Sequence, residues 1–277
     1  MDHNRMSERS PQTVRVGAVN YLNSKPLVEG LTDSGAGIDL VLDYPSRLAD
    51  DLAAGQLDVA LVPSIACLQN SDYEVISDAC VAACGDVLSV KLYCRVPPAK
   101  IQTLALDQGS RTSATLVQIL LAERYGLRPQ LKPLPLTWSV SDSDADGVLM
   151  IGDRAIHPPV EEFVETWDLG GEWMAWTGLP FVFAMWVAHR ETELGSVPDA
   201  LSAARDLGVS RIEAIARREA PLLGIPLDTT IDYLTNNLYY RLGERERLGL
   251  NRFYELGVEH GLAPEGVDLV FRNCATT

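Results

Sequence analysis

The sequence predicts an α/β protein of two lobes, in which helices cover mostly parallel β-sheets. Three observations indicate this fold class. Short apolar runs of strand type alternate with helix-forming runs, Pro97 and Pro98 divide this alternation into two blocks, and a late apolar run at 180–188 returns to the first block. We therefore expect the chain to cross between the lobes twice, with hinges at residues 94–98 and 184–189.

The first block predicts four strands and three short helices. The strands are apolar runs rich in Val, Ile and Leu, expected at residues 14–19, 38–43, 57–63 and 87–94. The first three are each followed by a helix-forming run, expected at 26–31, 47–54 and 64–68. Ser46 would cap the second of these helices at its N-terminus, and Gly55 would end it.

The second block repeats the pattern around one long helix. Strands are expected at 103–106 and 147–151, with a helix at 112–125 that Gly126 ends. Beyond the returning strand the chain is expected to be helical, because four-residue spacing relates three leucines and residues 248–256 continue in the same style. These leucines are Leu234, Leu238 and Leu242.

These blocks predict the domain organisation. Residues 1–13 form a polar tail, residues 14–96 and 187–277 form a discontinuous first lobe, and residues 97–186 form the second. A length of 277 residues with 47% hydrophobic content is sufficient for a sizeable core.

The composition excludes several classes of partner. The net charge of −15 argues against nucleic acid and against an anionic membrane surface, because both bind basic patches. It leaves room for a small anion held by local dipoles in a cleft. No apolar run approaches the roughly 18 residues of a membrane span, and the polar start lacks the apolar core of a secretion signal.

The cysteines indicate a reducing compartment. They are five in number and mostly lie in apolar surroundings, which suggests buried thiols in the cytoplasm: Cys67, Cys80, Cys84, Cys94 and Cys274. Cys80 and Cys84 have the i, i+4 spacing of a helix, which could hold a metal. No second pair of ligands lies nearby, so we expect no metal.

Polar side chains gather where three predicted strands pass into helices. Asn20, Asn23 and Ser24 follow the first strand, Ser64 follows the third, and the run 110–113 precedes the long helix. Free N–H groups at helix starts, with hydroxyl groups beside them, favour a carboxylate ligand. Ordinary helix capping is the alternative interpretation at each junction.

Two further polar residues allow two interpretations each. Ser89 could face a cleft or be a satisfied core serine, and Asp153 could face a cleft or cap a short helix. The chain has no glycine-rich nucleotide motif and no Gly-x-Ser-x-Gly elbow, and its histidines are scattered. The residues alone therefore indicate a two-lobed α/β protein that binds a small anion.

Several runs of the sequence resemble the chorismate dehydratases of the futalosine route to menaquinone. The specific ones are NYLN, within VGAVNYLNSKPL at 16–27, and TGLPFVFA at 177–184, and the resemblance continues in GQLDVALVPS at 55–64. Further matching runs are SRTS at 110–113, LMIGD at 149–153, YLT at 233–235 and GLNRFY at 249–254. The resemblance spans residues 14 to about 260, which is nearly the whole chain.

This resemblance implies a type II periplasmic-binding-protein-like fold, with a ligand cleft between the lobes, used by a cytoplasmic enzyme. The implied reaction removes water from chorismate and gives 3-[(1-carboxyvinyl)oxy]benzoate, with no cofactor, because aromatisation of the ring drives it. Asn23 is the implied catalytic residue. The substrate-binding candidates, from the junctions and the resemblance together, are Ser24, Ser64, Ser89, Ser110, Thr112, Ser113, Asp153 and Phe181.

The expected partner is therefore a small molecule, chorismate, and nothing indicates a protein partner. Among the candidate site residues the only carboxylate is Asp153, so we expect the enolpyruvyl carboxylate of the substrate to take the ring proton, with Asp153 as the rival base. Two alternatives stay open: a non-enzymatic solute-binding or sensor protein of the same fold, and the sister 1,4-dihydroxy-6-naphthoate synthase. The missing secretion signal counts against the first, and the Asn-Tyr-Leu-Asn opening counts against the second.

Overall fold

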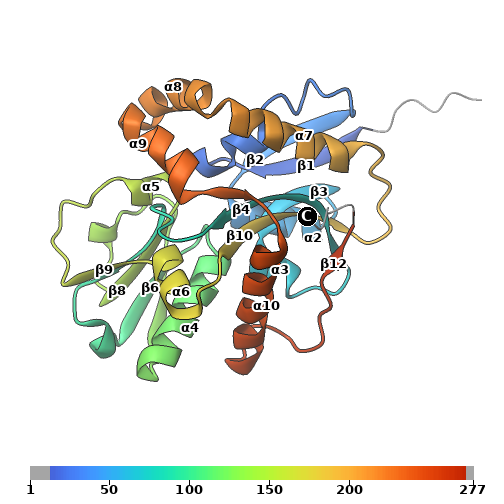
Figure 1. The fold of residues 1–277 in the computed structure, drawn as a ribbon. Coiled ribbons are helices and arrows are strands. Elements are labelled where there is room, and N and C mark those ends of the chain that lie inside the picture. Colours follow the sequence, from blue (N-terminus) through green and yellow to red (C-terminus); the bar gives the residue numbers. More distant parts are fainter. Residues whose placement is uncertain (1–12, 273–277) are drawn as a thin grey trace, which may run out of the picture.

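The computed structural model describes residues 13–272 and has the expected two-lobed α/β architecture, built on two β-sheets (Figure 1). Residues 1–12 of the predicted tail, and Cys274, lie outside the described residues. The first sheet has the strand order β11-β4-β10-β3-β1-β2, with β12 beside β4. The second sheet has the order β7-β6-β8-β5-β9.

The elements have the following bounds. The first sheet consists of β1 (Val14–Val19), β2 (Ile38–Asp43), β3 (Val59–Pro63), β4 (Tyr73–Ala83), β10 (Phe181–His189), β11 (Tyr239–Arg241) and β12 (Val270–Phe271). The second consists of β5 (Val90–Cys94), β6 (Thr103–Asp107), β7 (Gln130–Leu134), β8 (Gly147–Ile151) and β9 (Glu165–Asp168). The α-helices are α1 (Lys25–Val28), α2 (Pro45–Ala53), α3 (Ser64–Cys67), α4 (Thr112–Tyr125), α5 (Asp153–Ile156), α6 (Leu169–Thr177), α7 (Val197–Ser210), α8 (Ile212–Leu223), α9 (Leu227–Asp232) and α10 (Glu244–Glu259). Three 3₁₀ turns lie at Leu22–Ser24, Pro98–Lys100 and Val140–Asp142, and a π-helical turn lies at Tyr233–Asn237.

The predicted βα units are largely confirmed. β1, β2, β8 and α4 have the bounds that the apolar pattern predicts. Gly126 follows α4 with a φ of 66°, the left-handed conformation that ends a helix. The prediction of Ser46 as the cap of α2 is wrong, because α2 begins at Pro45, whose fixed φ suits the first helical position.

The sheets are mixed, which corrects the expectation that they are mostly parallel. β1 is parallel to β2 and β3, as βα alternation predicts. β10 is antiparallel to both β3 and β4, and β5 is antiparallel to both β8 and β9. These antiparallel strands are the ones by which the chain enters the second sheet and returns from it.

The chain crosses between the sheets at two places that differ from the predicted hinges. β4 belongs to the first sheet and β5 to the second, so the outward crossing is at residues 84–89 and not at 94–98. The return crossing is at residues 178–180, because the whole of β10, including the segment 184–189, lies in the first sheet. Sheet membership therefore divides the chain near 84–89 and 178–180, earlier than the predicted boundaries after residues 96 and 186.

Strand β4 is the longest of the described strands, and the sequence pattern does not reveal it. It is buried along its whole length, and its charged residues are paired: Glu74 with Arg272, and Asp78 with Arg205 at 2.9 Å. These charges interrupt the apolar run and conceal the strand. Cys80 lies in this strand, so the helical spacing assumed for Cys80 and Cys84 is wrong.

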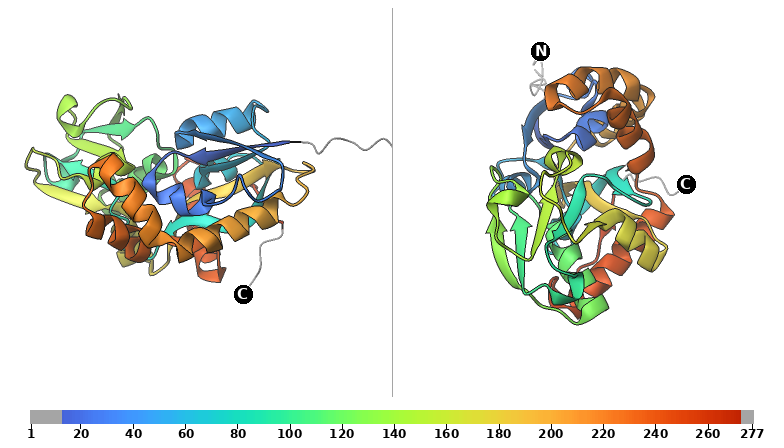
Figure 2. Two further views of the ribbon diagram at one scale, coloured as in Figure 1. Left: turned by 90° about the horizontal axis from the view of Figure 1, so that it is seen from above. Right: turned by 90° about the vertical axis from the view of Figure 1, so that its left-hand side faces the viewer.

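The C-terminal region is mostly helical but contains a strand where a helix is expected. Leu234, Leu238 and Leu242 are all buried, although they do not share a helix. The chain passes from the π-helical turn into β11, which pairs with β4. Helix α7 covers β4, and α10 packs against β10 (Figures 1 and 2).

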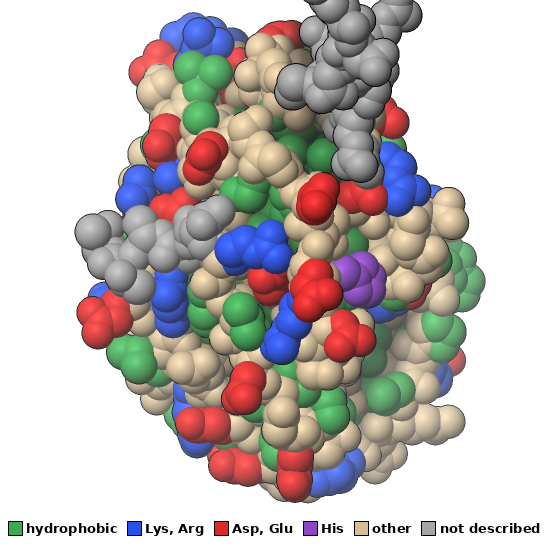
Figure 3. Space-filling view, turned by 90° about the vertical axis from the view of Figure 1, so that its right-hand side faces the viewer, with side chains coloured by type: hydrophobic (Ala, Val, Ile, Leu, Met, Phe, Trp, Pro, Cys, Tyr) green, Lys and Arg blue, Asp and Glu red, His purple; other side chains and the backbone are tan. Residues whose placement is uncertain are grey.

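Residues 13–272 contain neither a helix that could span a membrane nor a group of side chains that could hold a metal ion. No helix within residues 13–272 combines the length and the apolar character needed to cross a bilayer. Over the same residues, no group of three or more His, Cys, Asp or Glu side chains is placed to hold a metal ion. Acidic and basic side chains are interspersed on the face shown in Figure 3.

Candidate active site

A small cavity of about 50 Å³ lies between the two sheets, lined by residues of both lobes. The first lobe contributes the segment after β1, the end of β3 and the middle of β10. The second lobe contributes the junction before α4 and the residues where β8 ends. The polar part of the wall consists of Tyr21, Asn23, Ser89, Ser110, Arg111, Thr112 and Ser113. A larger open groove of about 990 Å³, beside α7, α8 and β11, contains none of the predicted site residues.

The turn after β1 brings Tyr21 and Asn23 to the cavity. The Ser24 hydroxyl donates to the Val19 carbonyl oxygen and, at 3.2 Å, to that of Tyr21, which bends the chain directly after the strand. Ser24 is fully buried behind this turn and does not line the cavity, so it supports the site without facing it. Asn20 is exposed and accepts a hydrogen bond from Lys25, so of the two amides only Asn23 faces the cavity.

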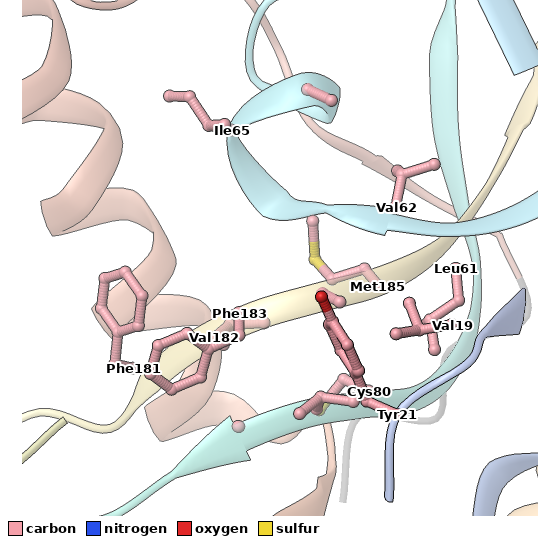
Figure 4. Close-up of a cluster of buried hydrophobic side chains, with 14 of the residues drawn as sticks. Val19, Tyr21, Leu61, Val62, Ile65, Cys80, Phe181, Val182, Phe183 and Met185 are labelled. Atoms are coloured by element: carbon pink, nitrogen blue, oxygen red, sulfur yellow. The ribbon is translucent and has the colours of Figure 1, made fainter. Parts of the chain in front are cut away.

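Two buried polar atoms in the cavity wall have no hydrogen-bond partner. They are the Tyr21 hydroxyl and the Asn23 Oδ1 oxygen. Tyr21 belongs to the same apolar cluster as Val19 and Met185 (Figure 4), and burial raises the pKa of its hydroxyl above the ordinary value. Leaving such a group unpaired costs about 1–3 kcal/mol, so both atoms suit a ligand that supplies the missing partners.

Hydroxyl-bearing residues gather at the start of α4, and they differ in the groups that they contact. The Ser110 Oγ accepts from the backbone N–H of Ser113, in the first turn of α4, at 3.2 Å, and both serines line the cavity. The Thr112 hydroxyl donates to the Phe183 carbonyl oxygen at 3.1 Å and lies 3.3 Å from Ser64 Oγ. Thr112 thus joins the two lobes, in addition to lining the cavity.

Ser64 and Phe181 lie behind the wall. The Ser64 hydroxyl donates to the Val182 carbonyl oxygen at 2.8 Å, and the side chain is fully buried. Phe181 packs edge-on against Trp173 and Phe253 in an aromatic cluster. Phe183, two residues further along β10, lines the cavity where Phe181 was expected.

Ser89 faces the cavity and is held from behind by Tyr233, a residue that the sequence-based site does not include. The Tyr233 hydroxyl donates to Ser89 Oγ at 2.8 Å, so the proton of Ser89 is left for an acceptor in the cavity. The π-helical turn at Tyr233–Asn237 presents this tyrosine to the site. Burial raises the pKa of Tyr233, and the hydrogen bond with Ser89 opposes that shift.

Arg111 is the one charged residue along the described cavity wall. It belongs to the second lobe, and its guanidinium donates to Asp50 of α2, in the first lobe, at 2.6 Å. The sequence places Arg111 inside a matched run, but the site derived from the sequence contains only hydroxyl groups at this junction.

Asp153 ties the second lobe to the turn that carries Asn23. Its carboxylate accepts from the Leu22 backbone N–H at 3.0 Å, and Gly152, not Asp153, lines the cavity. The side chain therefore bridges the lobes instead of capping its own helix, α5. Burial raises the pKa of Asp153 to about 6, and the hydrogen bond from Leu22 opposes this shift.

We expect Asp153→Asn to make stability less sensitive to pH. The folded protein holds this proton up to a pH of about 6, whereas the unfolded chain releases it near the ordinary pKa of 3.8. The wild-type protein should therefore lose about 1–2 kcal/mol of unfolding free energy between pH 5 and pH 8 through this group, and the variant should not. Urea unfolding of both proteins across this range tests it, and a difference that stays constant with pH would contradict it.

Comparisons with known proteins match most of the chain to a single family. A family described as menaquinone biosynthesis matches residues 14–259. The chain is 34% identical to chorismate dehydratase from Thermus thermophilus over 259 residues, covering 87% of this chain and 93% of the relative. It is 25% identical to chorismate dehydratase from Campylobacter jejuni over 233 residues, covering 84% and 88%.

Solved structures support the fold. The periplasmic aliphatic sulphonate binding protein from Escherichia coli aligns with a TM-score of 0.60 at 17% identity, covering 94% of this chain and 96% of its own. A Candida albicans protein with the generic periplasmic binding protein fold aligns with a TM-score of 0.62 at 12% identity, covering 92% of both chains. At such identities these likenesses show the architecture alone, which confirms the expected fold class.

Proposed function

We propose that this chain, which belongs to the menaquinone biosynthesis family, is a chorismate dehydratase that converts chorismate to 3-[(1-carboxyvinyl)oxy]benzoate and water. One observation of the structure carries the proposal. The cavity between the lobes contains two unpartnered polar atoms, Tyr21 Oη and Asn23 Oδ1, from the Asn-Tyr-Leu-Asn run, beside the start of α4. Such a site suits a polar substrate that enters between the lobes and satisfies both atoms.

The wall offers donors for the two carboxylates of chorismate. Hydroxyl groups of Ser110 and Ser113 stand at the N-terminus of α4, where backbone N–H groups favour negative charge. Ser89 keeps a proton to donate, and Arg111 adds a positive charge at the wall. In a protein with a net charge of −15, such local donors are what a dianion requires.

The reaction removes the proton from the ring carbon that bears the ether and expels the neighbouring hydroxyl group, which makes the ring aromatic. The described cavity wall has no carboxylate and no histidine, and Asp153 lies outside it. This supports the substrate's own enolpyruvyl carboxylate as the base, because it is held next to that proton and gains the advantage of an intramolecular reaction. Asn23 positions and polarises the substrate. Aromatisation drives the reaction, so no cofactor is needed.

Substrate entry requires the lobes to separate. An enclosed water needs about 10–15 Å³, so a cavity of about 50 Å³ holds a few waters and is too small for chorismate. The segments 84–89 and 178–180 are the places where the chain passes between the sheets. Opening about these segments would admit the substrate, and closure would exclude bulk water.

We expect Arg111→Ala to weaken substrate binding. Loss of one charge-assisted hydrogen bond, worth about 1.5–3 kcal/mol, should raise KM roughly ten- to a hundredfold. Asp50→Ala is the matched control, because it removes the other half of the same ion pair and leaves the guanidinium at the cavity. Steady-state kinetics should show no rise in KM for the control, and equal KM values in the two variants would move the carboxylate site elsewhere.

The proposed activity is tested by incubating the purified protein with chorismate and following the benzoate product by ultraviolet absorbance and chromatography. Saturable turnover is expected. Binding of chorismate without turnover would favour a solute-binding or sensor protein, and turnover of cyclic dehypoxanthine futalosine would favour the sister naphthoate synthase.

We also propose that the enzyme acts in the futalosine route and in the cytoplasm. The resemblance of the Asn-Tyr-Leu-Asn opening supports the route. The free and buried thiols of Cys67, Cys80 and Cys94 support a reducing compartment.

A further inference from the structure

Expulsion of the ring hydroxyl group requires a proton donor, and the cavity-lining residues predicted from the sequence do not include a good one. A departing hydroxide is a poor leaving group unless a proton reaches it as the carbon–oxygen bond breaks. Among the sequence-predicted residues that line the cavity are an amide at Asn23 and aliphatic hydroxyl groups such as Ser89, and neither is a good acid. The one carboxyl group of the candidate set, Asp153, lies outside the wall and accepts from the Leu22 backbone N–H. A phenol is more acidic than an amide or an aliphatic hydroxyl group, and one lies in the cavity wall.

The Tyr21 side chain crosses from the first lobe into the second. Its ring stands over Gly152, where a Cβ atom would lie 2.7 Å from the ring. Its hydroxyl lies beside Gly109, where a Cβ atom would lie 3.2 Å from the oxygen. Two glycines thus make room for one ring, one at the junction before α4 and one where β8 ends.

The Tyr21 hydroxyl is placed for use by a ligand. The residue is 7% exposed, lines the cavity, and its hydroxyl has no partner within the described residues. Burial and the nearby Asp107, Tyr44 and Asp153 raise its pKa, whereas Arg154 lowers it. The balance keeps the proton on the oxygen at neutral pH, so Tyr21 enters the reaction as a donor.

We infer that the Tyr21 hydroxyl is the acid that protonates the departing hydroxyl group of chorismate. The inference rests on the proposed function. The proton on the ether-bearing carbon passes to the enolpyruvyl carboxylate, its electron pair forms the last double bond of the aromatic ring, and the neighbouring carbon–oxygen bond breaks. The leaving oxygen takes the Tyr21 proton and departs as water. The proton on the product carboxyl then returns to the tyrosinate, so the enzyme is regenerated and one water is lost in total.

Tyr21→Phe tests this step, because it removes one oxygen and keeps the ring over Gly152. Tyr44→Phe is the matched control: its ring packs edge-on against Tyr21 at 6.0 Å, and it does not line the cavity. We expect Tyr21→Phe to lower kcat about a hundredfold or more, the range of general acid catalysis. Its thermal unfolding midpoint should stay the same or rise, because the lost hydroxyl was buried and unpaired. The control should keep kcat within twofold.

The affinity for the benzoate product separates an acid from a simple binding group. The product lacks the ring hydroxyl, so Tyr21→Phe should leave its dissociation constant within about twofold of the wild-type value. Unchanged kcat in Tyr21→Phe, or product binding that weakens in step with kcat, would overturn the inference while leaving the proposed function in place. If the wild-type protein itself fails to turn over chorismate, the proposed function is wrong and the inference falls with it.

Discussion

Replacing Asn23 by aspartate is expected to reduce kcat by well over tenfold while the protein remains folded. The substitution keeps the shape of the side chain and adds a carboxylate at the cavity wall, beside a substrate that already carries two. A penalty of about 1.4 kcal/mol in the transition state is already tenfold in rate, and like charges in a closed cavity exceed it. Single-turnover kinetics with chorismate, with circular dichroism to verify folding, measure the effect.

Asn20→Asp is the matched control, because it makes the same chemical change three residues earlier in the same run. Asn20 is exposed and its side chain accepts from Lys25, away from the cavity. We expect this variant to keep kcat within about twofold. Equal losses in the two variants would mean that charge anywhere on this turn disturbs the enzyme, and the special role of Asn23 would be lost.

The second large effect is expected from Gly152→Ala. Gly152 has φ 71° and ψ −159°, a conformation essentially limited to glycine, and its added Cβ would lie 2.7 Å from the Tyr21 ring. Backbone strain and the displaced ring should together lower the unfolding free energy by about 2–4 kcal/mol. Because the ring cannot stay in place, kcat should also fall more than tenfold.

Gly126→Ala separates these two contributions. Gly126 also has a positive φ, 66°, but its added Cβ would meet no atom within 4 Å. We expect a stability loss of about 1 kcal/mol and no change in kcat. Chemical denaturation and steady-state kinetics of both variants provide the test, and full activity in Gly152→Ala would show that the position of Tyr21 is unimportant.

The parts of the fold that the sequence predicts are those in which local and tertiary preferences agree. Helix α4 buries an apolar set from Leu116 to Leu121, strand β8 is apolar and buried throughout, and a glycine follows each, so their bounds match the structure. Strand β4 is missed because Glu74 and Asp78 lie within it, and their partners Arg272 and Arg205 come from distant parts of the chain. These ion pairs form only in the folded chain, so no local sequence pattern predicts them.

The sequence predicts the part of the site that lies at two strand-to-helix junctions, after β1 and before α4. Asn23, Ser110 and Ser113 line the cavity, as the junctions indicate. Ser24 and Ser64 carry the same signal, but their hydroxyl groups bind backbone carbonyl oxygens behind the wall. A hydroxyl group at a strand end serves a ligand or the fold, and only packing decides which.

Tyr21 and Tyr233 are missing from the sequence-based site for different reasons. Tyr21 lies inside the most specific run, where an aromatic ring reads as core packing. Tyr233 reaches Ser89 because of a π-helical turn, whose period differs from the 3.6-residue period used to predict helices. In the structure, Tyr21 is identified by its buried hydroxyl group without a partner. Tyr233 is identified by its hydrogen bond to Ser89, which is distant from it in the sequence.

The central claim is that elimination occurs at the Asn23 side of the cavity with the substrate's own carboxylate as base, and a comparison of kcat for Asn23→Ala and Asp153→Asn tests it most directly. Asp153 is the nearest rival base, but its carboxylate bridges the lobes through Leu22 and does not line the cavity. The account predicts a loss of well over tenfold in Asn23→Ala and a loss below about threefold in Asp153→Asn, measured with saturating chorismate. Near-total loss in Asp153→Asn with a mild loss in Asn23→Ala would contradict it and identify Asp153 as the base.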